Sequence, residues 1–271
     1  MNDAHIYCRP DQLKEEFRAV LDMHTDYYNM FRLSDYWMRL SLHEPGNKEK
    51  YVDDPEAWEY SERIIREVLD EMDIRYEAVP DEAAFYGPKV DFQIKNVIGR
   101  EETASTNQLD FAMPERFELS YIGEDGAEHR PYIVHRAPLG THERFIAFLI
   151  EHFGGAFPTW MAPLQVKLIP IKESALAYAE ELEQLMLSKL IRVEIDRSAD
   201  SFNKKIRNNV TKKIPNMLIL GDKEVESRNV TWRRYAVKEQ QTMPADSFVD
   251  LVQKMTAERT MDNFADIPIE L

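Results

Sequence analysis

Two stretches in the first half of the chain place apolar residues at the three- and four-residue spacing of an amphipathic helix. One follows Pro10 and includes Leu13, Phe17 and Val20. The other follows Pro55, and proline suits the first turn of a helix because an N–H at that position would have no partner inside the helix. The spacing therefore predicts two helices that begin near these prolines.

The other apolar segments of the first half are short, rich in β-branched and aromatic residues, and bounded by turn-forming residues, as is typical of strands. Strands are predicted over residues 33–43, 74–80, 85–94 and 105–113. A hairpin is predicted over residues 118–135, with its turn at Glu124-Asp125-Gly126. Two helices on a mainly antiparallel sheet favour an α+β domain over a series of βαβ units.

Strand-like and helix-like segments alternate from about residue 162 onwards. Strands are predicted over residues 164–171, 191–196, 216–221 and 230–237, and helices near 173–189, near 201–211 and from 244. This alternation predicts a small α/β domain with a mixed sheet. We therefore expect two domains, at residues 1–162 and 163–271.

The composition is that of an ordinary globular protein, with 44% hydrophobic and 31% charged residues. A single cysteine, Cys8, excludes a disulfide within the chain and gives no sign of an oxidising compartment. No apolar run approaches the roughly 20 residues of a membrane-spanning helix. The polar N-terminus also has no apolar core of a signal peptide. We therefore expect a cytoplasmic protein with no membrane partner.

The net charge of −15 argues against a general nucleic-acid coat, because phosphate binding needs neutralising cations. Two segments are nevertheless basic. Residues 203–213 carry five basic residues and no acid, and residues 228–238 interleave basic residues with Trp232 and Tyr235. One hypothesis is a face that binds a specific RNA, with Trp232 and Tyr235 beside exposed bases. The alternative is a solvated helix face.

Residues 134–145, VHRAPLGTHERF, predict a strand, a tight turn and a helix with Thr141 as its N-cap. Arg144 falls in the first turn of that helix, where the helix dipole favours an anion rather than a cation. A bound phosphate would explain the arginine, because a helix N-terminus and a guanidinium together bind anions well. The alternative is that Arg144 pairs with Glu143 or another acid, or is solvated.

Six strings in one order resemble the C-terminal portion of threonyl-tRNA synthetases, a class II synthetase family. They are NDAHIYC, FYGPKVDF, STNQLDFAMPERF, VHRAPLGTHERF, FPTWMAPLQV and KIPNMLILGDKEVE. The resemblance covers essentially the whole chain. It implies part of a class II catalytic domain built on an antiparallel sheet, followed by a small α/β anticodon-binding domain with a mixed sheet.

The resemblance also implies a site for ATP with Mg²⁺. GTHERF resembles the third class II signature, so Arg144 would hold the γ-phosphate and Thr141 would stand where the family has serine. Lys89 would offset charge as pyrophosphate leaves. The residues that match positions beside the amino acid are Asp3, Tyr86 and Gln108. The alternative is that Tyr86 only packs against the sheet and Lys89 is exposed.

Zinc is implied by the resemblance, because His5 and His135 match two of the family's zinc ligands. A metal that coordinates the hydroxyl of threonine would separate it from valine, which a hydrophobic pocket does poorly. The family's third ligand, a cysteine, matches nothing in this chain. Cys8 lies at a possible metal spacing from His5, but the family does not use that position. We therefore expect weak zinc binding.

Two further stretches depart from the family. Residues 102–106 read ETAST where the family has Trp-Gln-Cys-Gly-Thr, so we expect weakened nucleotide binding. In the second domain, Glu224 and Arg233 match positions that contact anticodon bases. Lys213 stands where the family has arginine, and a lysine cannot form the same bidentate pair with a guanine.

Two functions follow from these patterns. The first is a threonine–tRNA ligase-type protein that activates threonine with ATP and transfers it to tRNA(Thr). The family's first two signatures match nothing here, so this chain is expected to be a fragment or a truncated form that works with a separate N-terminal chain or as a homodimer. The alternative is a non-catalytic, synthetase-derived paralogue that binds RNA or protein. For the ligase the expected partner is tRNA, through its anticodon loop.

Overall fold

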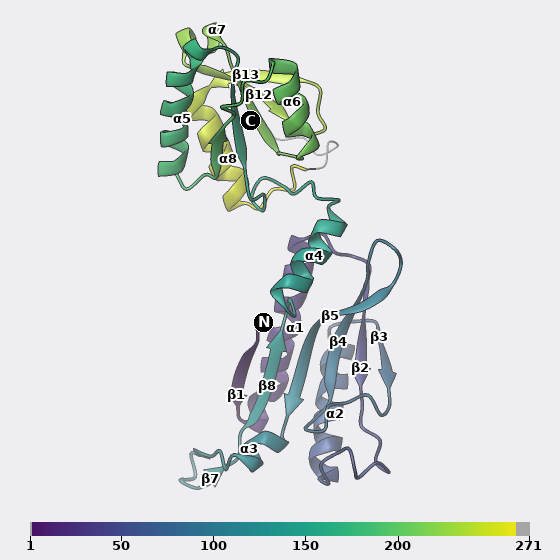
Figure 1. Cartoon of the computed structure of the whole chain (residues 1–271). Helices are drawn as coiled ribbons and strands as arrows, with labels where there is room; N and C mark the ends of the chain where they lie inside the picture. Colours follow the sequence, from purple (N-terminus) through teal and green to yellow (C-terminus); the bar gives the residue numbers. More distant parts are fainter. Residues whose placement is uncertain (1, 264–271) are drawn as a thin grey trace. The chain divides into compact units, whose positions relative to one another are not determined.

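The computed structural model describes residues 2–263 and divides into two compact units, Met1–His152 and Phe153–Leu271 (Figure 1). The division falls after His152 rather than at about residue 162. The reason is that Thr159 is fastened to the second unit. Its N–H donates to Asp262 Oδ1 at 2.7 Å, and its Oγ1 accepts from Asn216 Nδ2 at 2.7 Å.

The first unit is built on a six-stranded sheet in the order β1-β8-β5-β4-β2-β3. Its strands are β1 (Ala4–Cys8), β2 (Tyr36–Ser41), β3 (Tyr76–Val79), β4 (Lys89–Lys95), β5 (Glu101–Asp110) and β8 (Tyr132–Ala137). All neighbouring pairs are antiparallel except β2 and β3, which are parallel. The predicted α+β fold is therefore confirmed, with β1 as an additional edge strand.

Two long helices cover one face of this sheet (Figure 1). The helical elements of the unit are the 3₁₀ turn η1 (Pro10–Gln12), α1 (Leu13–Met30), α2 (Pro55–Glu71), α3 (Ala112–Arg116) and α4 (His142–His152). A small hairpin joins β6 (Tyr121–Ile122) to β7 (Glu128–His129). The Asp54 carboxylate accepts from the Ala57 N–H at 3.0 Å and so caps α2.

Two of the predicted strands have different ends from those expected, and one of them, β5, begins earlier, at Glu101. The strand predicted over 105–113 ends at Asp110, because the Asp110 carboxylate accepts from the N–H groups of Ala112 and Met113 and starts α3. The strand predicted over 85–94 begins only at Lys89. Residues 85–88 form a turn in which the Gly87 N–H donates to the Ala84 carbonyl at 3.3 Å.

Side chains alternate between the two faces of the sheet, as they must in extended strands. Val90, Phe92 and Leu109 are fully buried, and the Phe92 ring lies 5.1 Å from that of Tyr28 on α1. Lys89 and Gln108 directly precede Val90 and Leu109 in their strands and therefore project from the other side. We call this side, which carries Lys89, Gln108, His135 and His5, the polar face.

His24 on α1 is buried in the core of the first unit. Its side chain is fully inaccessible, and neither ring nitrogen has a hydrogen-bond partner among residues 2–263. Burial, helped by the nearby Arg136 charge, lowers the pKa of His24 to about 3. The folded state therefore binds fewer protons than the unfolded state between pH 3 and about 6.5, so stability falls as pH falls through that window.

We expect His24→Leu to raise the unfolding free energy of the first unit by about 1 kcal/mol at pH 7, because an unpaired polar ring leaves the core. The gain should grow by up to about 1.4 kcal/mol per pH unit below pH 6, since leucine does not titrate. Urea unfolding at pH 7 and pH 5, monitored by hydrogen exchange, measures both values. His142→Leu, at an exposed position, is the control; an equal gain there would contradict the explanation.

The second unit has a five-stranded sheet in the order β10-β9-β11-β12-β13. Its strands are β9 (Val166–Pro170), β10 (Val193–Ile195), β11 (Asn216–Leu220), β12 (Asn229–Arg234) and β13 (Gln240–Pro244). β9 is parallel to β10 and β11, whereas β12 is antiparallel to β11 and β13. The predicted mixed sheet is confirmed, although the strand expected to reach residue 237 ends at Arg234 and β13 follows it.

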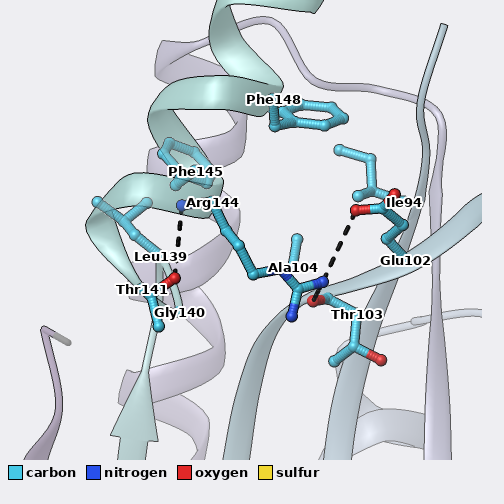
Figure 2. Close-up of a pocket in the computed structure, with 10 residues that line it drawn as sticks. All are labelled: Ile94, Glu102, Thr103, Ala104, Leu139, Gly140, Thr141, Arg144, Phe145 and Phe148. Atoms are coloured by element: carbon cyan, nitrogen blue, oxygen red, sulfur yellow. Dashed lines mark hydrogen bonds and ion pairs between the residues drawn. The ribbon is translucent and has the colours of Figure 1, made fainter.

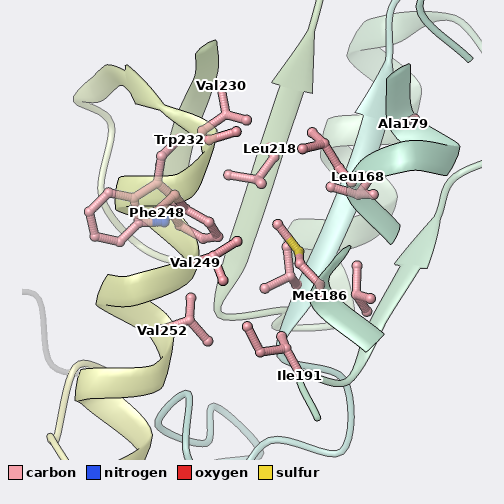
Figure 3. Packing of buried hydrophobic residues seen from close by; sticks show 14 of the residues in the cluster. Leu168, Ala179, Met186, Ile191, Leu218, Val230, Trp232, Phe248, Val249 and Val252 are labelled. Carbon is pink, nitrogen blue, oxygen red and sulfur yellow. The ribbon is translucent and has the colours of Figure 1, made fainter. Parts of the chain in front are cut away.

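Helices cover both faces of the second sheet. They are η2 (Glu173–Ala175), α5 (Leu176–Ser188), α6 (Phe202–Thr211), α7 (Asp222–Ser227) and α8 (Ala245–Ala257). The larger core packs α5 and α8 against one face, and the Phe248 ring of α8 packs against Trp232 (Figure 3). A smaller core, which includes Ile206 of α6 and Met217 of β11, lies on the other face. Over residues 2–263, no helix is both long and apolar enough to cross a membrane.

Trp232 belongs to the larger core. It is 3% exposed, and its indole N–H donates to Asn216 Oδ1 at 2.9 Å. The hypothesis that Trp232 lies beside exposed RNA bases is therefore wrong, because its strand position turns it toward α8. Tyr235 lies in the turn after β12 and is half-buried.

Candidate functional site

Four residues singled out from the sequence form one row across the polar face. His5 on β1 lies opposite His135 on β8, His135 lies opposite Gln108 on β5, and Gln108 lies opposite Lys89 on β4. Directly opposed residues of an antiparallel pair project to the same side. The sheet therefore brings together side chains that are up to 130 positions apart in the chain.

Tyr86 covers this row from the turn before β4. Its hydroxyl donates to Gln108 Oε1, and its ring lies 5.5 Å from the His135 ring. Burial, followed by the charges of Asp110, Asp3 and Asp91, raises the pKa of Tyr86 to about 12. Tyr86 therefore stays a neutral hydroxyl at physiological pH, and it does more than pack against the sheet.

Lys89 is held in a buried ion pair rather than exposed. Its ammonium donates to Asp91 Oδ2, and Arg39 Nη2 lies 3.0 Å from the same oxygen. The side chain of Lys89 is 17% exposed and that of Asp91 only 3%. Asp91 and Arg39 were not predicted from the sequence. The available signal was the two-residue spacing in KVD, which puts Asp91 on the same side of the strand as Lys89.

The two histidines predicted as metal ligands lie close together. Their ring centroids lie 4.5 Å apart, and His135 Nε2 lies 2.8 Å from Oδ2 of the buried Asp110. A carboxylate on the second ring nitrogen is how metal-binding histidines are commonly held. However, no three His, Cys, Asp or Glu side chains within residues 2–263 converge as metal ligands.

Cys8 does not complete the set. It lies three positions from His5 in the same strand, so the two side chains project to opposite sides. Cys8 is buried, and burial followed by nearby acids raises the pKa of its thiol to about 11. A zinc site needs three or four ligands. The side chains of residues 2–263 therefore do not by themselves fit a zinc ion.

Arg144 lies in a second part of the site, a pocket at the start of α4 (Figure 2). The pocket is lined by Ile94, Glu102, Thr103, Ala104, Leu139, Gly140, Thr141, Arg144, Phe145 and Phe148. Thr141 Oγ1 accepts from the Arg144 N–H at 3.4 Å, as expected of an N-cap. Gly140 has a φ of +59°, and a Cβ there would lie 2.9 Å from the Ala104 carbonyl oxygen. The turn therefore needs glycine.

The Arg144 side chain extends from α4 toward Thr103 and Glu102 of β5 (Figure 2). Its Nη2 lies 3.5 Å from the Thr103 carbonyl oxygen and 3.7 Å from Glu102 Oε2. The side chain remains 64% exposed. Arg144 thus pairs with an acid, Glu102 rather than its neighbour Glu143, and still has donors available to an anion.

Two of the three expected anticodon residues have roles in the fold of the second unit. Lys213 Nζ donates to the Gly154 carbonyl. Glu224 accepts from the Gly221 N–H at 2.9 Å and from Thr231 Oγ1 at 2.8 Å. Burial works against ionisation of Glu224, but these hydrogen bonds outweigh it and lower its pKa.

Arg233 is the third expected anticodon residue. It lies opposite Met217 on β11 and Gln240 on β13, hence on the same side of the sheet as α6. Its buried Nε has no hydrogen-bond partner among residues 2–263. Its neighbour Arg234 projects to the opposite side, where its Nη2 donates to the Asp262 carbonyl at 2.6 Å.

The basic segment 203–213 does not form one charged surface. Lys205 is 8% exposed, and its ammonium donates to the Asp196 carbonyl at 3.1 Å. Lys204 pairs with Asp200 at 2.6 Å. Arg207 and Lys212 remain exposed. Neither an RNA-binding face nor a solvated face describes Lys205, which is part of the interior.

Comparisons with known proteins agree with this architecture. A family model for the "tRNA synthetase class II core domain (G, H, P, S and T)" matches residues 1–153, and one for the "Anticodon binding domain" matches residues 165–255. The threonine–tRNA ligase of Oceanobacillus iheyensis is 49% identical over 255 residues, which are 94% of this chain and 40% of that relative. That of Geobacillus kaustophilus is 49% identical over 253 residues, 93% and 39% of the two chains.

A solved structure has the same fold. It is the RNA binding domain of threonyl-tRNA synthetase from Cryptosporidium parvum Iowa II, with a TM-score of 0.88 and 32% identity over 94% of this chain and 63% of that one. The chain spans about 40% of the length of the curated relatives named above. Since the core-domain model matches more than half of the residues, the chain belongs to the class II tRNA synthetase core-domain family, and an anticodon-binding domain follows that core in the sequence.

Proposed function

We propose that this chain takes part in threonine activation and tRNA binding as a portion of a threonine–tRNA ligase. The observation that carries the proposal is the row of His5, His135, Gln108 and Lys89 on the polar face. The Arg144 pocket is lined in part by β5, which is also the strand that carries Gln108. The relatives are threonine–tRNA ligases, which supports threonine as the amino acid and tRNA as the nucleic acid. The cytoplasm is the proposed location.

In this proposal the threonine carboxylate attacks the α-phosphorus of ATP. A new O–P bond forms, the bond to the β-phosphate breaks, and pyrophosphate leaves with Mg²⁺. Lys89 offsets the charge that develops on the α-phosphate, and Arg144 with Thr141 holds the γ-phosphate. The residues proposed to hold threonine are Asp3, Tyr86 and Gln108. A terminal tRNA hydroxyl then attacks the activated carbonyl carbon and AMP leaves.

Positioning supplies most of the catalysis in this scheme. Lys89 is well suited to it, because the Asp91 carboxylate holds its ammonium in place and the residue lies opposite Gln108 in the sheet. Tyr86 is suited to donate a hydrogen bond, because it remains protonated at neutral pH. The scheme assigns no step to zinc.

We expect ATP with Mg²⁺ to bind only at millimolar concentrations, and Arg144→Ala to weaken that binding at least about tenfold. The guanidinium supplies the charge-assisted hydrogen bonds at the phosphate end, and alanine supplies none. Titration calorimetry measures both. Arg130→Ala removes an exposed arginine elsewhere in the first unit and is the control. Unchanged ATP affinity in Arg144→Ala would remove the phosphate role from this residue.

We expect Arg233→Ala to reduce the preference for a threonine-tRNA anticodon stem-loop over a scrambled loop by about 1–3 kcal/mol. The guanidinium can make a bidentate contact with a base edge, which a phosphate contact cannot replace. Arg207→Ala, at an exposed position of α6, should instead weaken both RNAs about equally. Filter binding with both loops decides. Equal affinity of the unmutated chain for the two loops would end the anticodon proposal.

A second candidate is a non-catalytic paralogue that keeps only the RNA-binding role. The observation that favours it is the carboxylate of Glu102 beside Arg144. Threonine-dependent exchange of pyrophosphate into ATP separates the two candidates. The assay is run on the chain alone and as an assembly, since a second copy or a separate N-terminal chain is the proposed partner of the ligase. Exchange in either form supports the ligase, and tRNA binding without exchange in both supports the paralogue.

A further inference from the structure

We propose that Glu102 is an internal competitor for the anion site at Arg144, so that a triphosphate must displace this carboxylate from the guanidinium before it binds. The inference rests on the proposed function of Arg144 and adds a specificity-determining residue to the same pocket. It makes weak nucleotide binding a property of one side chain.

The geometry shows a charge pair inside the pocket. Glu102 Oε2 lies 3.7 Å from Arg144 Nη2, and both residues line the pocket at the start of α4 (Figure 2). The same Nη2 lies 3.5 Å from the Thr103 carbonyl oxygen. Two oxygen acceptors of β5 therefore share the guanidinium from one side, and a bound phosphate would be a third acceptor with a larger charge.

The hairpin between β4 and β5 holds Glu102 in this orientation. Glu102 Oε1 accepts from Asn96 Nδ2 at 3.2 Å. Asn96 is itself oriented, because its Oδ1 accepts from the N–H groups of Ile98 and Arg100 at 3.2 and 2.9 Å. The carboxylate is thus anchored at one oxygen and presents the other to Arg144. Its side chain is 38% exposed, so it retains part of its hydration.

The expected size of the effect follows from this partial exposure. A solvent-exposed ion pair contributes at most about 1 kcal/mol, which is roughly a fivefold change in affinity. Repulsion between the remaining carboxylate and a triphosphate adds to it and is screened by salt. Removing the charge of Glu102 should therefore tighten anion binding by about three- to tenfold at low salt.

Glu102→Gln is the test, because glutamine keeps the shape and can still accept from Asn96. We expect the affinity for inorganic tripolyphosphate without Mg²⁺, and for ATP with Mg²⁺, to rise about three- to tenfold at 50 mM salt. The gain should fall at 500 mM salt and should be at most about twofold in an Arg144→Ala background. Glu101→Gln is the matched control, since this exposed neighbour accepts from Trp37 Nε1 and lies outside the pocket.

Each other outcome overturns the inference. An equal gain with and without Arg144, or an equal gain from Glu101→Gln, would mean general electrostatics rather than competition. Weaker ATP·Mg²⁺ binding in Glu102→Gln, with tripolyphosphate unchanged, would make Glu102 a magnesium ligand. If Arg144→Ala abolishes binding while Glu102→Gln binds like the unmutated chain, only this inference fails. If Glu102→Gln binds neither anion and Arg144→Ala changes nothing, the proposed phosphate role of Arg144 fails with it.

Discussion

Gly87→Ala is expected to lower the unfolding free energy of the first unit by about 3 kcal/mol or more. A Cβ at this position would lie 2.9 Å from the Leu109 carbonyl carbon and closer still to its oxygen. These are backbone atoms of β5, so no flexible side chain can move out of the way. The turn and the strand would have to separate.

The separation should also reach the proposed site. The Leu109 N–H donates to the Pro88 carbonyl at 3.0 Å, and the Phe111 N–H donates to the Tyr86 carbonyl at 3.3 Å. These bonds fasten the turn to the end of β5, and they would lengthen. We expect the Tyr86 ring and Lys89 to shift relative to Gln108. Chemical denaturation gives the stability change, and hydrogen exchange at Leu109 and Phe111 reports the loss of the two bonds.

Gly46→Ala is the matched control for this prediction. Its backbone does not adopt a positive φ, and a Cβ there would meet nothing closer than the flexible Glu44 side chain at 3.8 Å. The substitution should change stability by no more than about 0.5 kcal/mol. A first unit as stable with alanine at position 87 as with alanine at 46 would show that the turn and strand are not in close contact.

Asp262→Ala should destabilise the second unit by about 3 kcal/mol, because it breaks a buried polar network. Asp262 is 5% exposed and accepts from the N–H and the hydroxyl of Thr159 at 2.7 and 2.5 Å. Thr159 in turn bonds to Asn216 and Gln165. Alanine would leave the Thr159 N–H buried with no acceptor. Urea unfolding measures the loss, and Asp250→Ala, at an exposed position of α8, controls for the lost charge.

Asp262→Asn separates shape from charge. An asparagine oxygen can still accept from the Thr159 N–H, so we expect a loss of only about 1 kcal/mol at pH 7. Burial raises the pKa of Asp262 above its ordinary value, although the Thr159 hydrogen bonds oppose the shift. The folded state therefore binds more protons than the unfolded state just above pH 3.9.

The stability advantage of aspartate over asparagine should accordingly shrink as pH rises from about 4 through the raised pKa of Asp262. Unfolding of the two proteins from pH 4 to pH 8 gives this difference directly and cancels the titration of all other groups. An advantage that grows with pH in this range would mean that the carboxylate is stabilised rather than penalised by burial.

Local pattern was a good guide wherever a segment needs only its neighbours in sequence. The periodicity at Leu13, Phe17 and Val20 predicts α1, and the Asp54-Pro55 start of α2 is observed together with its cap. The short elements α3 and β13 were not predicted, because neither of them arises from a periodic pattern of apolar residues. α3 exists because Asp110 caps it, and β13 because β12 ends in a turn where Ala236 has a φ of +59°.

The proposed site divides in the same way. Identity and order of residues were enough to single out Lys89, Gln108, His135 and Arg144. Their partners were not visible, because each partner comes from another strand. Asp91 and Arg39 meet at Lys89, Asp110 meets His135, and Glu102 meets Arg144 only after β4, β5, β8 and α4 have packed.

By itself, then, the sequence determined the α+β and α/β classes, most helices and strands, and the residues that carry a resemblance to class II synthetases. Only the tertiary structure decided that Trp232 and Lys205 lie in the interior, that the chain divides after His152, and that the two histidines find no third ligand among residues 2–263. The physical reason is the separation along the chain over which each effect acts. Propensity and periodicity act over a few neighbouring residues, whereas burial, charge pairing and ligand sets depend on strand register, which brings distant residues to one place.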